Sequence, residues 1–177
     1  MKTRLRPASS NDAAAVAALL IDTRAAFMPY APSVHSDSEV RAWVATTLVP
    51  ASGVTVAELD GRVVAAMAVS LAVSMSVAVS IDAQTKVAWI EQMAVDPALV
   101  GRGIGSTLLG HAMQTLPRPL RLYTFAANTG ARRFYERHGF VALRFSDGRD
   151  NEERCPDVLY ELASPAPPAG TIASCLT

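Results

Sequence analysis

The chain has few of the residues that bind metals or build disulfide frameworks. Its 177 residues include two cysteines, Cys155 and Cys175, which do not form a CxxC pair. The three histidines, His35, His111 and His138, stand in neither HxxE nor HExxH spacing. Zinc sites need closely spaced cysteines or histidines, and disulfide frameworks need several cysteines. We therefore expect a reduced protein without a metal site.

The chain also has no net charge. Sixteen Lys and Arg residues balance sixteen Asp and Glu residues, and a basic cluster at Arg132, Arg133 and Arg137 is only local. Because a strong basic excess is what attracts nucleic acid and anionic membranes, we expect neither as a partner. The first ten residues, MKTRLRPASS, lack the apolar run of a signal peptide. A cytoplasmic location is the simplest expectation.

One long segment lacks charged residues altogether. Val63–Ile81 is nineteen residues without a charge, close to the length of a membrane-spanning helix. From Met67 onward, however, larger apolar residues at odd positions alternate with Ala and Ser, a period of two that is typical of a strand. Fully extended, the segment would span about 60 Å, more than a usual strand. We therefore expect a bent or bulged strand, a β-arm whose small-residue face packs against a second subunit of a homodimer, or two strands joined by a kink.

The remaining pattern predicts one domain over residues 1–163 and a flexible Pro- and Ala-rich tail over 164–177. An Asp60-Gly61 pair between two apolar runs predicts a tight hairpin. Pro117 and Gly139 are expected to end helices. The other predicted strands cover residues 3–6, 53–59, 86–95, 120–126, 140–145 and 157–162, and the predicted helices cover 11–27, 37–48, 106–115 and 128–138.

Three glycines at alternate positions, Gly101, Gly103 and Gly105, follow the strand at 86–95 and open a helix. A strand, a glycine loop and a helix N-terminus present free backbone N–H groups to a phosphate. A nucleoside-triphosphate loop would end in Gly-Lys-Ser/Thr, but Ser106 follows Gly105 directly. A dinucleotide site would need GxGxxG spacing and an acid about twenty residues later, near Phe125, and both are missing.

The loop Val100–Gly105 instead resembles the coenzyme A pyrophosphate loop of the GNAT acetyltransferase superfamily, Q/R-x-x-G-x-G/A, and departs from it at Val100. Residues 91–97 resemble the family's fourth strand, which leads into that loop. Residues 128–140 resemble its N-x-x-A-x-x-x-Y-x-x-x-G-F helix. The resemblance implies an α/β (α+β) fold. It has a mixed, mostly antiparallel sheet of about seven strands, flanked by helices and splayed between strands 4 and 5.

The resemblance also implies an acetyl-CoA-dependent N-acetyltransferase that acts on a primary amine by direct attack in a ternary complex. Glu91 is the candidate general base, with a water chain as the other possibility. Strand alternation would place Glu91 on the face of Trp89, Met93 and Val95, partly desolvated. A backbone N–H of Met93 or Ala94 would bind the oxyanion. Tyr135 would be the general acid.

Other positions are implied to bind the ligands. We expect Phe134 to face the core, because it shares helical spacing with Ala131 and His138. Asn128 would hydrogen-bond the pantetheine arm or cap its helix. Coenzyme A binding is implied for Met93, Ala94, Val95, Val100, Gly101, Arg102, Gly103, Ile104, Gly105, Ser106, Asn128, Arg132 and Tyr135, and acceptor binding for Phe27, Tyr30, His35, Glu91, Asn151 and Glu153.

Two alternatives stay open. The segment 147–154 carries four carboxylates, which suit a cationic acceptor, and also Arg149 and Arg154, which could neutralise them into an ordinary solvated loop. The chain could also be a catalytically silent coenzyme A-binding sensor or interaction module. The presence of both Glu91 and Tyr135 favours an enzyme.

Overall fold

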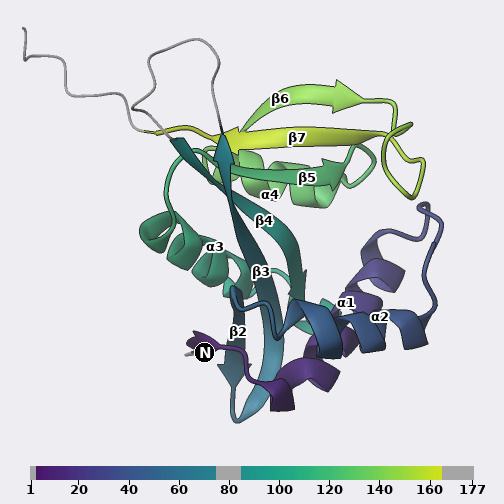
Figure 1. Ribbon diagram of the computed structural model, residues 1–177, viewed down its shortest axis with the longest axis vertical. Coiled ribbons are helices and arrows are strands. Elements are labelled where there is room, and N and C mark those ends of the chain that lie inside the picture. The colour runs from purple at the N-terminus through teal and green to yellow at the C-terminus, as the bar shows by residue number, and fades with distance from the viewer. Residues whose placement is uncertain (1–2, 75–84, 165–177) are drawn as a thin grey trace, which may run out of the picture.

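A computed structural model describes residues 3–74 and 85–164 (Figure 1). Each predicted strand and helix has a counterpart there, whereas the predictions for residues 75–84 and for the tail beyond residue 164 lie outside the described residues. The strands are β1 (Arg4–Pro7), β2 (Val54–Leu59), β3 (Arg62–Ser74), β4 (Thr85–Val95), β5 (Leu120–Phe125), β6 (Val141–Ser146) and β7 (Asp157–Leu162), and the helices are α1 (Ala13–Phe27), α2 (Asp37–Trp43), α3 (Ile104–Thr115) and α4 (Thr129–Arg137). Short 3₁₀ turns span Ser10–Asp12 and Pro97–Leu99, and a π-helical turn spans Val44–Leu48.

The strands form one sheet of seven in the order β1-β2-β3-β4-β5-β7-β6. Neighbouring strands are antiparallel except β4 and β5, which are parallel. That parallel pairing covers only Ala88–Ile90 against Leu120–Leu122. β4 continues to Val95 on β3 alone, and β5 continues to Phe125 on β7 alone. The predicted mixed sheet, splayed between strands 4 and 5, is confirmed.

The long alternating segment is a strand, as its period predicted, over the part that the structure describes. β3 pairs with β4 from Ala65 to Ser74, whereas its pairing with β2 ends at Ala68. Opposite Val69–Leu71, β4 still pairs with β5, so β3 and β4 form a two-stranded extension of the sheet only from Ala72 to Ser74 (Figure 1). A register shift between Ala68 and Val69 marks a β-bulge. The segment is therefore both bulged and extended, which keeps it from running as one flat strand.

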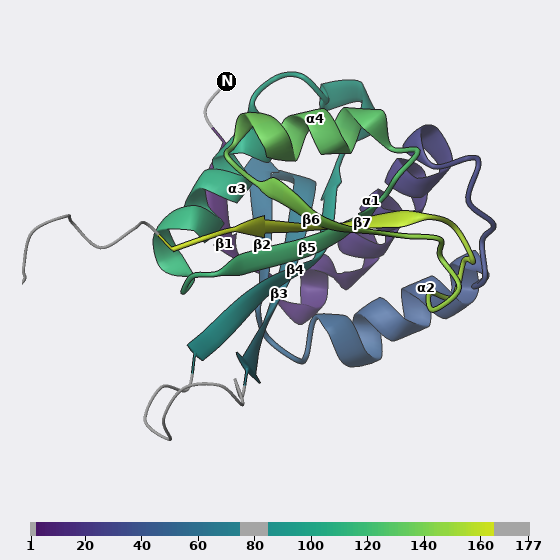
Figure 2. The same ribbon diagram turned by 90° about the horizontal axis from the view of Figure 1, so that it is seen from above.

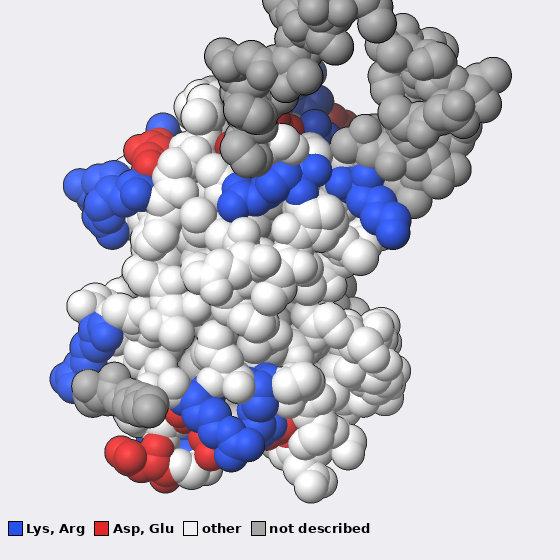
Figure 3. Space-filling view, turned by 90° about the vertical axis from the view of Figure 1, so that its left-hand side faces the viewer, with Lys and Arg blue, Asp and Glu red and all other residues white. Residues whose placement is uncertain are grey.

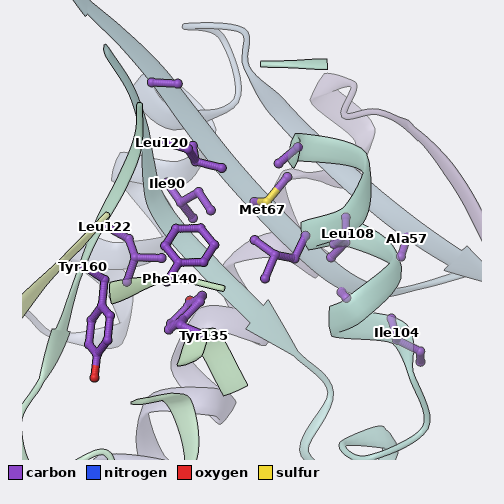
Figure 4. Close-up of a cluster of buried hydrophobic side chains, with 14 of the residues drawn as sticks. Ala57, Met67, Ile90, Ile104, Leu108, Leu120, Leu122, Tyr135, Phe140 and Tyr160 are labelled. Carbon is purple, nitrogen blue, oxygen red and sulfur yellow. The ribbon is translucent and has the colours of Figure 1, made fainter. Parts of the chain in front are cut away.

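The sheet has a separate hydrophobic cluster on each face. The larger cluster lies under α3 and α4 and includes Met67, Leu108 and Tyr135 (Figure 4). The smaller cluster lies under α1 and the π-helical turn and includes Val16 and Val44. Figure 2 shows α4 and α2 on opposite sides of the sheet. Because helices cover both faces, the central strands are buried. This packing holds the carboxyl ends of β4 and β5 in place where they separate.

The chain reversals follow the predicted chemistry. Asp60 and Gly61 both have positive φ, 51° and 76°, as a tight hairpin with two left-handed residues requires. Gly139 has φ of 86° just after α4. α3 differs from its prediction because it begins at Ile104, two residues before Ser106. Gly103 supplies its N-cap in the left-handed conformation.

An ion-pair network fastens the amino terminus to the sheet edge. Arg6 donates to both carboxylate oxygens of Asp12 at 2.8 Å and to Glu58 on the neighbouring strand at 2.8 Å. Asp12 is the one buried charged residue among those described. The Arg6 guanidinium holds the pKa of the Asp12 carboxyl well below its usual range. The network thus fixes the start of α1 against β1 and β2.

The side of the molecule on which α3 lies is weakly charged. Figure 3, which views that side, shows a broad band without charged side chains between basic and acidic groups above and below it. The sequence of α3, IGSTLLGHAMQT, contains no charged residue. In the described part of the chain, no helix combines the length and the apolarity needed to cross a membrane.

Candidate active site

A cleft of about 1320 Å³ opens where β4 and β5 separate. Its walls come from Ile90–Met93 on β4, Tyr123–Phe125 on β5, the glycine loop, α4, the end of α1 and the loop before β7. Pockets for one small molecule usually hold about 300–1,000 Å³. The cleft is therefore larger than a usual pocket for one small molecule.

The glycine loop forms one end of this cleft. Gly101 and Gly103 have φ of 83° and 84°, and a Cβ added at either would meet no atom within 4 Å. Glycine is thus required there by the backbone conformation rather than by space. α3 begins directly after Gly103 without a side-chain cap. The first N–H groups of α3 have no acceptor within the helix, so they are suited to bind an anion.

The other loop residues have different surroundings. Val100 is exposed and lines the cleft, and so does Ser106. Arg102 is also exposed, whereas the Ile104 side chain is buried in the larger hydrophobic cluster. A Cβ at Gly105 would lie 3.4 Å from Cε of Met93. The loop thus rests on β4 while its backbone faces the cleft.

α4 turns both of its aromatic residues toward the core. Phe134 packs with Ala131 against the larger hydrophobic cluster, as helical spacing predicted. Tyr135 is the buried residue of this helix. Its ring packs on Phe140, with ring centroids 5.6 Å apart (Figure 4). Gly139 turns the chain back so that the Phe140 N–H bonds the Tyr135 carbonyl at 3.2 Å. This return places an aromatic ring beneath Tyr135, a contact that helical spacing alone does not reveal.

The Tyr135 hydroxyl remains at the cleft wall, where it donates to Sδ of Met93 at 3.8 Å. Burial raises the pKa of Tyr135 to about 12, because the phenolate would lose its solvation. Phe134 is half-buried and lines the cleft. Its ring also contacts the His138 ring, with centroids 4.5 Å apart, and Nδ1 of His138 lies 2.8 Å from the Phe134 carbonyl. Both aromatic residues of α4 therefore reach the cleft.

Glu91 also differs from its expected placement. Ala68 pairs with Gln92 and Val69 with Ile90, so Glu91 is the extra residue of the β-bulge. Its side chain is exposed, lines the cleft and accepts a hydrogen bond from the Ser70 hydroxyl. The prediction of a partly desolvated Glu91 that shares a face with Met93 was wrong, because the bulge shifts the strand alternation by one residue.

The bulge also explains the positions of the neighbouring side chains. Ile90 belongs to the larger hydrophobic cluster, and Met93 and Val95 pack against the same cluster. Ala94 belongs to the cluster on the opposite face. Without the extra residue, Ile90 and Met93 would point to opposite faces of the sheet. The bulge thus places Glu91 at the cleft while Met93 supports Tyr135.

Two polar residues near α4, Asn128 and Arg132, form hydrogen bonds with other residues of the chain. The Asn128 side chain caps α4 by accepting from the Ala131 N–H at 3.1 Å, and it also lines the cleft. Arg132 donates to the Tyr160 hydroxyl and to the Ala126 carbonyl, both at 3.2 Å, and does not line the cleft. Arg132, which was predicted to bind coenzyme A, is therefore directed toward β7. The cap role expected for Asn128 is confirmed.

The end of the cleft formed by α1 and the loop between β6 and β7 contains some of the residues predicted to bind the acceptor. Phe27, Glu91, Asn151 and Glu153 line the cleft. Glu153 forms an ion pair with Arg24 of α1 at 3.2 Å, which joins the loop between β6 and β7 to the end of α1. Among residues 3–74 and 85–164, no group of three or more His, Cys, Asp or Glu is arranged to hold a metal ion.

Two predicted acceptor residues lie outside the cleft wall. Tyr30 packs edge-on against Phe125 at 6.2 Å between ring centroids, and burial raises its pKa. His35 contacts Glu152 at 3.0 Å on the exposed side of the same loop. Both contacts join the segment after α1 to the far side of the cleft. Tyr30 and His35 therefore lie beside this end of the cleft without lining it.

Sequence reasoning missed several cleft residues. Tyr123 and Phe125 on β5, Arg144 on β6 and Asp157 on β7 all line the cleft. Tyr123 stacks on Trp89 at 5.7 Å, and its hydroxyl accepts from Arg144 at 3.2 Å. The sequence did carry a signal for Tyr123 and Phe125. Both lie at the predicted carboxyl end of a strand next to the expected opening of the sheet, where side chains border a cleft. The register with β7 was not available from the sequence.

The chain thus has a mixed α/β sheet that opens between β4 and β5 beside a glycine loop. The sequence profile of the acetyltransferase (GNAT) family matches residues 20–140. That match covers more than half of the chain. The chain therefore belongs to the GNAT acetyltransferase family.

Solved structures support the same fold. One is described as histone acetyltransferase HPA2 and related acetyltransferase from Corynebacterium glutamicum, with TM-score 0.68, 20% identity and coverage of 96% of this chain and 100% of that one. Apo-form YjaB from Escherichia coli gives TM-score 0.67 and 19% identity, with coverage of 91% and 97%. PaiA N-acetyltransferase from Thermoplasma acidophilum, in complex with coenzyme A, gives 0.66 and 17%, with coverage of 93% and 100%. No sequence among curated proteins matches the chain. At these identities the structural likeness concerns the fold alone.

Proposed function

We propose that the chain is an N-acetyltransferase that moves an acetyl group from acetyl-CoA to a primary amine by direct attack in a ternary complex. One observation carries the proposal: the glycine loop, Glu91 and Tyr135 all line the same cleft. The cleft has room for a donor and an acceptor.

The acetyl-CoA donor would lie between the glycine loop and the point where β4 and β5 separate. The first N–H groups of α3, after Gly103, would bind the pyrophosphate. The pantetheine arm would run along β4 past Met93, where pairing with β5 has already ended at Ile90. Beyond Ile90, β4 has no partner strand on its β5 side. An N–H of Met93 or Ala94 would stabilise the oxyanion of the tetrahedral intermediate.

The acceptor needs a base because an alkyl ammonium has a pKa near 10.4, so only about one molecule in 2,500 is neutral at pH 7. Glu91 would take that proton, directly or through water, as the amine nitrogen attacks the thioester carbon. Its exposure and its hydrogen bond from Ser70 keep the carboxylate oriented at the cleft and open to a proton relay. The proton thus leaves toward solvent.

Collapse of the intermediate breaks the carbon–sulfur bond and releases the coenzyme A thiolate. The Tyr135 hydroxyl would donate to that sulfur as negative charge develops on it. A pKa of about 12 keeps Tyr135 protonated across the physiological range, so the donor is always present. Because a thiol has a pKa near 8.5, the hydroxyl supports the leaving sulfur chiefly in the transition state.

The test is acetyl-CoA turnover with a panel of primary amines, followed by thiol release and by mass of the acetylated product. Wild-type protein should release coenzyme A only when an amine is present, and Tyr135→Phe should reduce the rate. Tight coenzyme A binding without thiol release for any amine would favour the silent coenzyme A-binding module instead.

A further inference from the structure

We propose that Arg137, the last residue of α4, binds the 3′-phosphate of coenzyme A, so that the protein selects coenzyme A over donors that lack this phosphate. The inference rests on the proposed acetyl transfer and deepens it at the end of the cleft formed by the glycine loop, α3 and α4, here called the donor end. It starts from the arginines of the cleft wall, which are Arg24, Arg137 and Arg144.

Two of these arginines are already engaged. Arg24 donates to Glu153, and Arg144 donates to the Tyr123 hydroxyl. Within the part of the chain that the structure describes, Arg137 has neither a hydrogen bond nor an ion pair, and its side chain is exposed. A guanidinium carries five N–H donors and keeps its charge at any physiological pH. The Arg137 side chain is therefore available to an anionic ligand in the cleft.

The face of α4 that carries Arg137 borders the start of α3. Gly130, Phe134 and Arg137 share that face, because residues at i, i+4 and i+7 lie on one side of a helix, and all three line the cleft. A Cβ at Gly105 would lie 3.5 Å from Cζ of Phe134. Arg137 lies about one turn beyond Phe134. It therefore adjoins the donor end of the cleft.

The course of the chain places Arg137 away from the loop between β6 and β7. α4 starts just after the carboxyl end of β5, where Phe125 pairs with Asp157 beside that loop. It ends at Arg137, shortly before Val141. Val141 pairs with Glu161, near the opposite end of β7. Arg137 and the loop thus lie toward opposite ends of the strands.

The charges of the cleft wall are divided in the same way. Among the described residues that the glycine loop, α3 and α4 contribute to the wall, Arg137 alone is charged. The carboxylates of the wall come from β4, β7 and the loop between β6 and β7, and they are Glu91, Asp147, Asp150, Glu153 and Asp157. An anion at the donor end would therefore meet a guanidinium and no carboxylate of the wall.

Coenzyme A brings two anionic groups to this end, a pyrophosphate and the 3′-phosphate of its ribose. The free N–H groups at the start of α3 suit the pyrophosphate. From there the pantetheine arm would run toward Met93, so the ribose would lie on the other side of the pyrophosphate, toward Arg137. A phosphate monoester carries a charge of about −1.5 to −2 at pH 7, and a guanidinium can bind two of its oxygens at once. The 3′-phosphate is therefore the group that fits Arg137.

The experiment compares coenzyme A with 3′-dephospho-coenzyme A, which differ in this phosphate alone, by calorimetric titration of the full chain. In wild-type protein, Kd for the dephospho form should exceed Kd for coenzyme A by about tenfold, as expected for one hydrogen-bonded contact between charged groups. In Arg137→Gln the ratio should fall to near one. This variant should fold as wild type does, because Arg137 is exposed and unpaired among the described residues.

Arg133→Gln is the matched control. Arg133 is an exposed residue of the same helix, donates to the carbonyl and hydroxyl of Thr129 and does not line the cleft. Its removal lowers the net charge by the same amount, so the ratio of the two Kd values should stay as in wild type. An equal fall of the ratio in both variants would reveal attraction by net charge alone and would overturn the role of Arg137.

The other outcomes separate this inference from the function on which it rests. Equal Kd values in wild type, or an unchanged ratio in Arg137→Gln, would overturn the role of Arg137 and leave acetyl transfer standing. Failure of both forms to bind would overturn the inference and the proposed donor together. Selective binding of coenzyme A without acetylation of any amine would overturn the proposed acetyl transfer and leave the role of Arg137 standing.

Discussion

The hydroxyl of Tyr135 on α4 donates to the thioether sulfur of Met93 on β4, 3.8 Å away. The two residues are far apart in sequence, and their contact ties the helix to the strand at the point where β4 leaves β5. A thioether sulfur is a weak acceptor. The hydroxyl can therefore exchange this partner for a ligand at little cost, which suits a donor group at the wall of the cleft.

Removal of that hydroxyl should affect catalysis more than stability. Tyr135→Phe loses one weak hydrogen bond and keeps its ring contacts, so its free energy of unfolding should change by less than about 1 kcal/mol. The kcat for acetyl transfer should fall by about 100-fold, with little change in KM for acetyl-CoA. Urea unfolding and steady-state kinetics measure the two effects. Tyr160→Phe is the matched control, because its hydroxyl bonds Glu136 and Arg132 outside the cleft. A larger kcat loss in the control than in Tyr135→Phe would contradict the assigned role.

Burial of Tyr135 predicts a loss of stability in alkali. The pKa is about 12 in the folded protein and about 10 in the unfolded chain, so between these values the unfolded state binds fewer protons. Stability from this group is complete below pH 10 and is lost as the pH rises toward 12. By pH 11 the loss should be about 1.4 kcal/mol. The difference in urea stability between wild type and Tyr135→Phe, measured at pH 8 and pH 11, isolates this contribution, and a difference independent of pH would refute it.

Glu91→Gln tests the base without disturbing the fold. The side chain is exposed and sits at a bulge, so stability should remain within about 0.5 kcal/mol of wild type. The kcat/KM for the amine should fall by about 100-fold or more, because the isosteric amide cannot take the proton. Glu152→Gln removes the same charge from an exposed site outside the cleft and serves as the control. A Glu91→Gln protein with wild-type turnover would instead favour a water chain.

Two Gly-to-Ala changes, one at the start of α3 and one inside it, should have opposite effects on the free energy of unfolding. Gly103 has φ of 84°, so Gly103→Ala should lower the free energy of unfolding by about 1–2 kcal/mol and weaken coenzyme A binding. Gly110 lies inside α3, where an added Cβ would meet no atom within 4 Å. Gly110→Ala should therefore raise stability by up to about 1 kcal/mol and leave binding unchanged. Thermal unfolding and calorimetric titration with coenzyme A measure both. Equal stability in the two variants would refute the conformational argument.

The sequence predicted the elements well because their signals are local. The Asp60-Gly61 turn, the alternation from Met67 and the end of α4 before Gly139 each depend on a few neighbouring residues. The order of elements around Gly101–Gly105 resembles that of a known family, and this resemblance was enough to predict the splayed sheet. The start of α3 was missed by two residues because Gly103, with its left-handed backbone, replaced a side-chain cap.

The site was less predictable because its geometry depends on pairing between distant strands. The bulge at Glu91 arises from the register of β4 on β3, and one extra residue moved its side chain to the opposite face. Arg132 shares its helix with Tyr135, yet it is directed to Tyr160 on β7. Arg137 stood out in the sequence only as part of a local basic cluster, since its place at the cleft depends on the rotation of α4.

By itself, the sequence determined the strand, the glycine loop and the helix that follow one another at Gly101–Gly105, because backbone conformation is a local property of glycine and its neighbours. It also determined the family, through the residues around Tyr135. Only the tertiary structure decided which side chains reach the cleft. Strand register and helix rotation are set by packing across the whole sheet, and they brought Glu91, Tyr135 and Arg137 to the walls of one cavity.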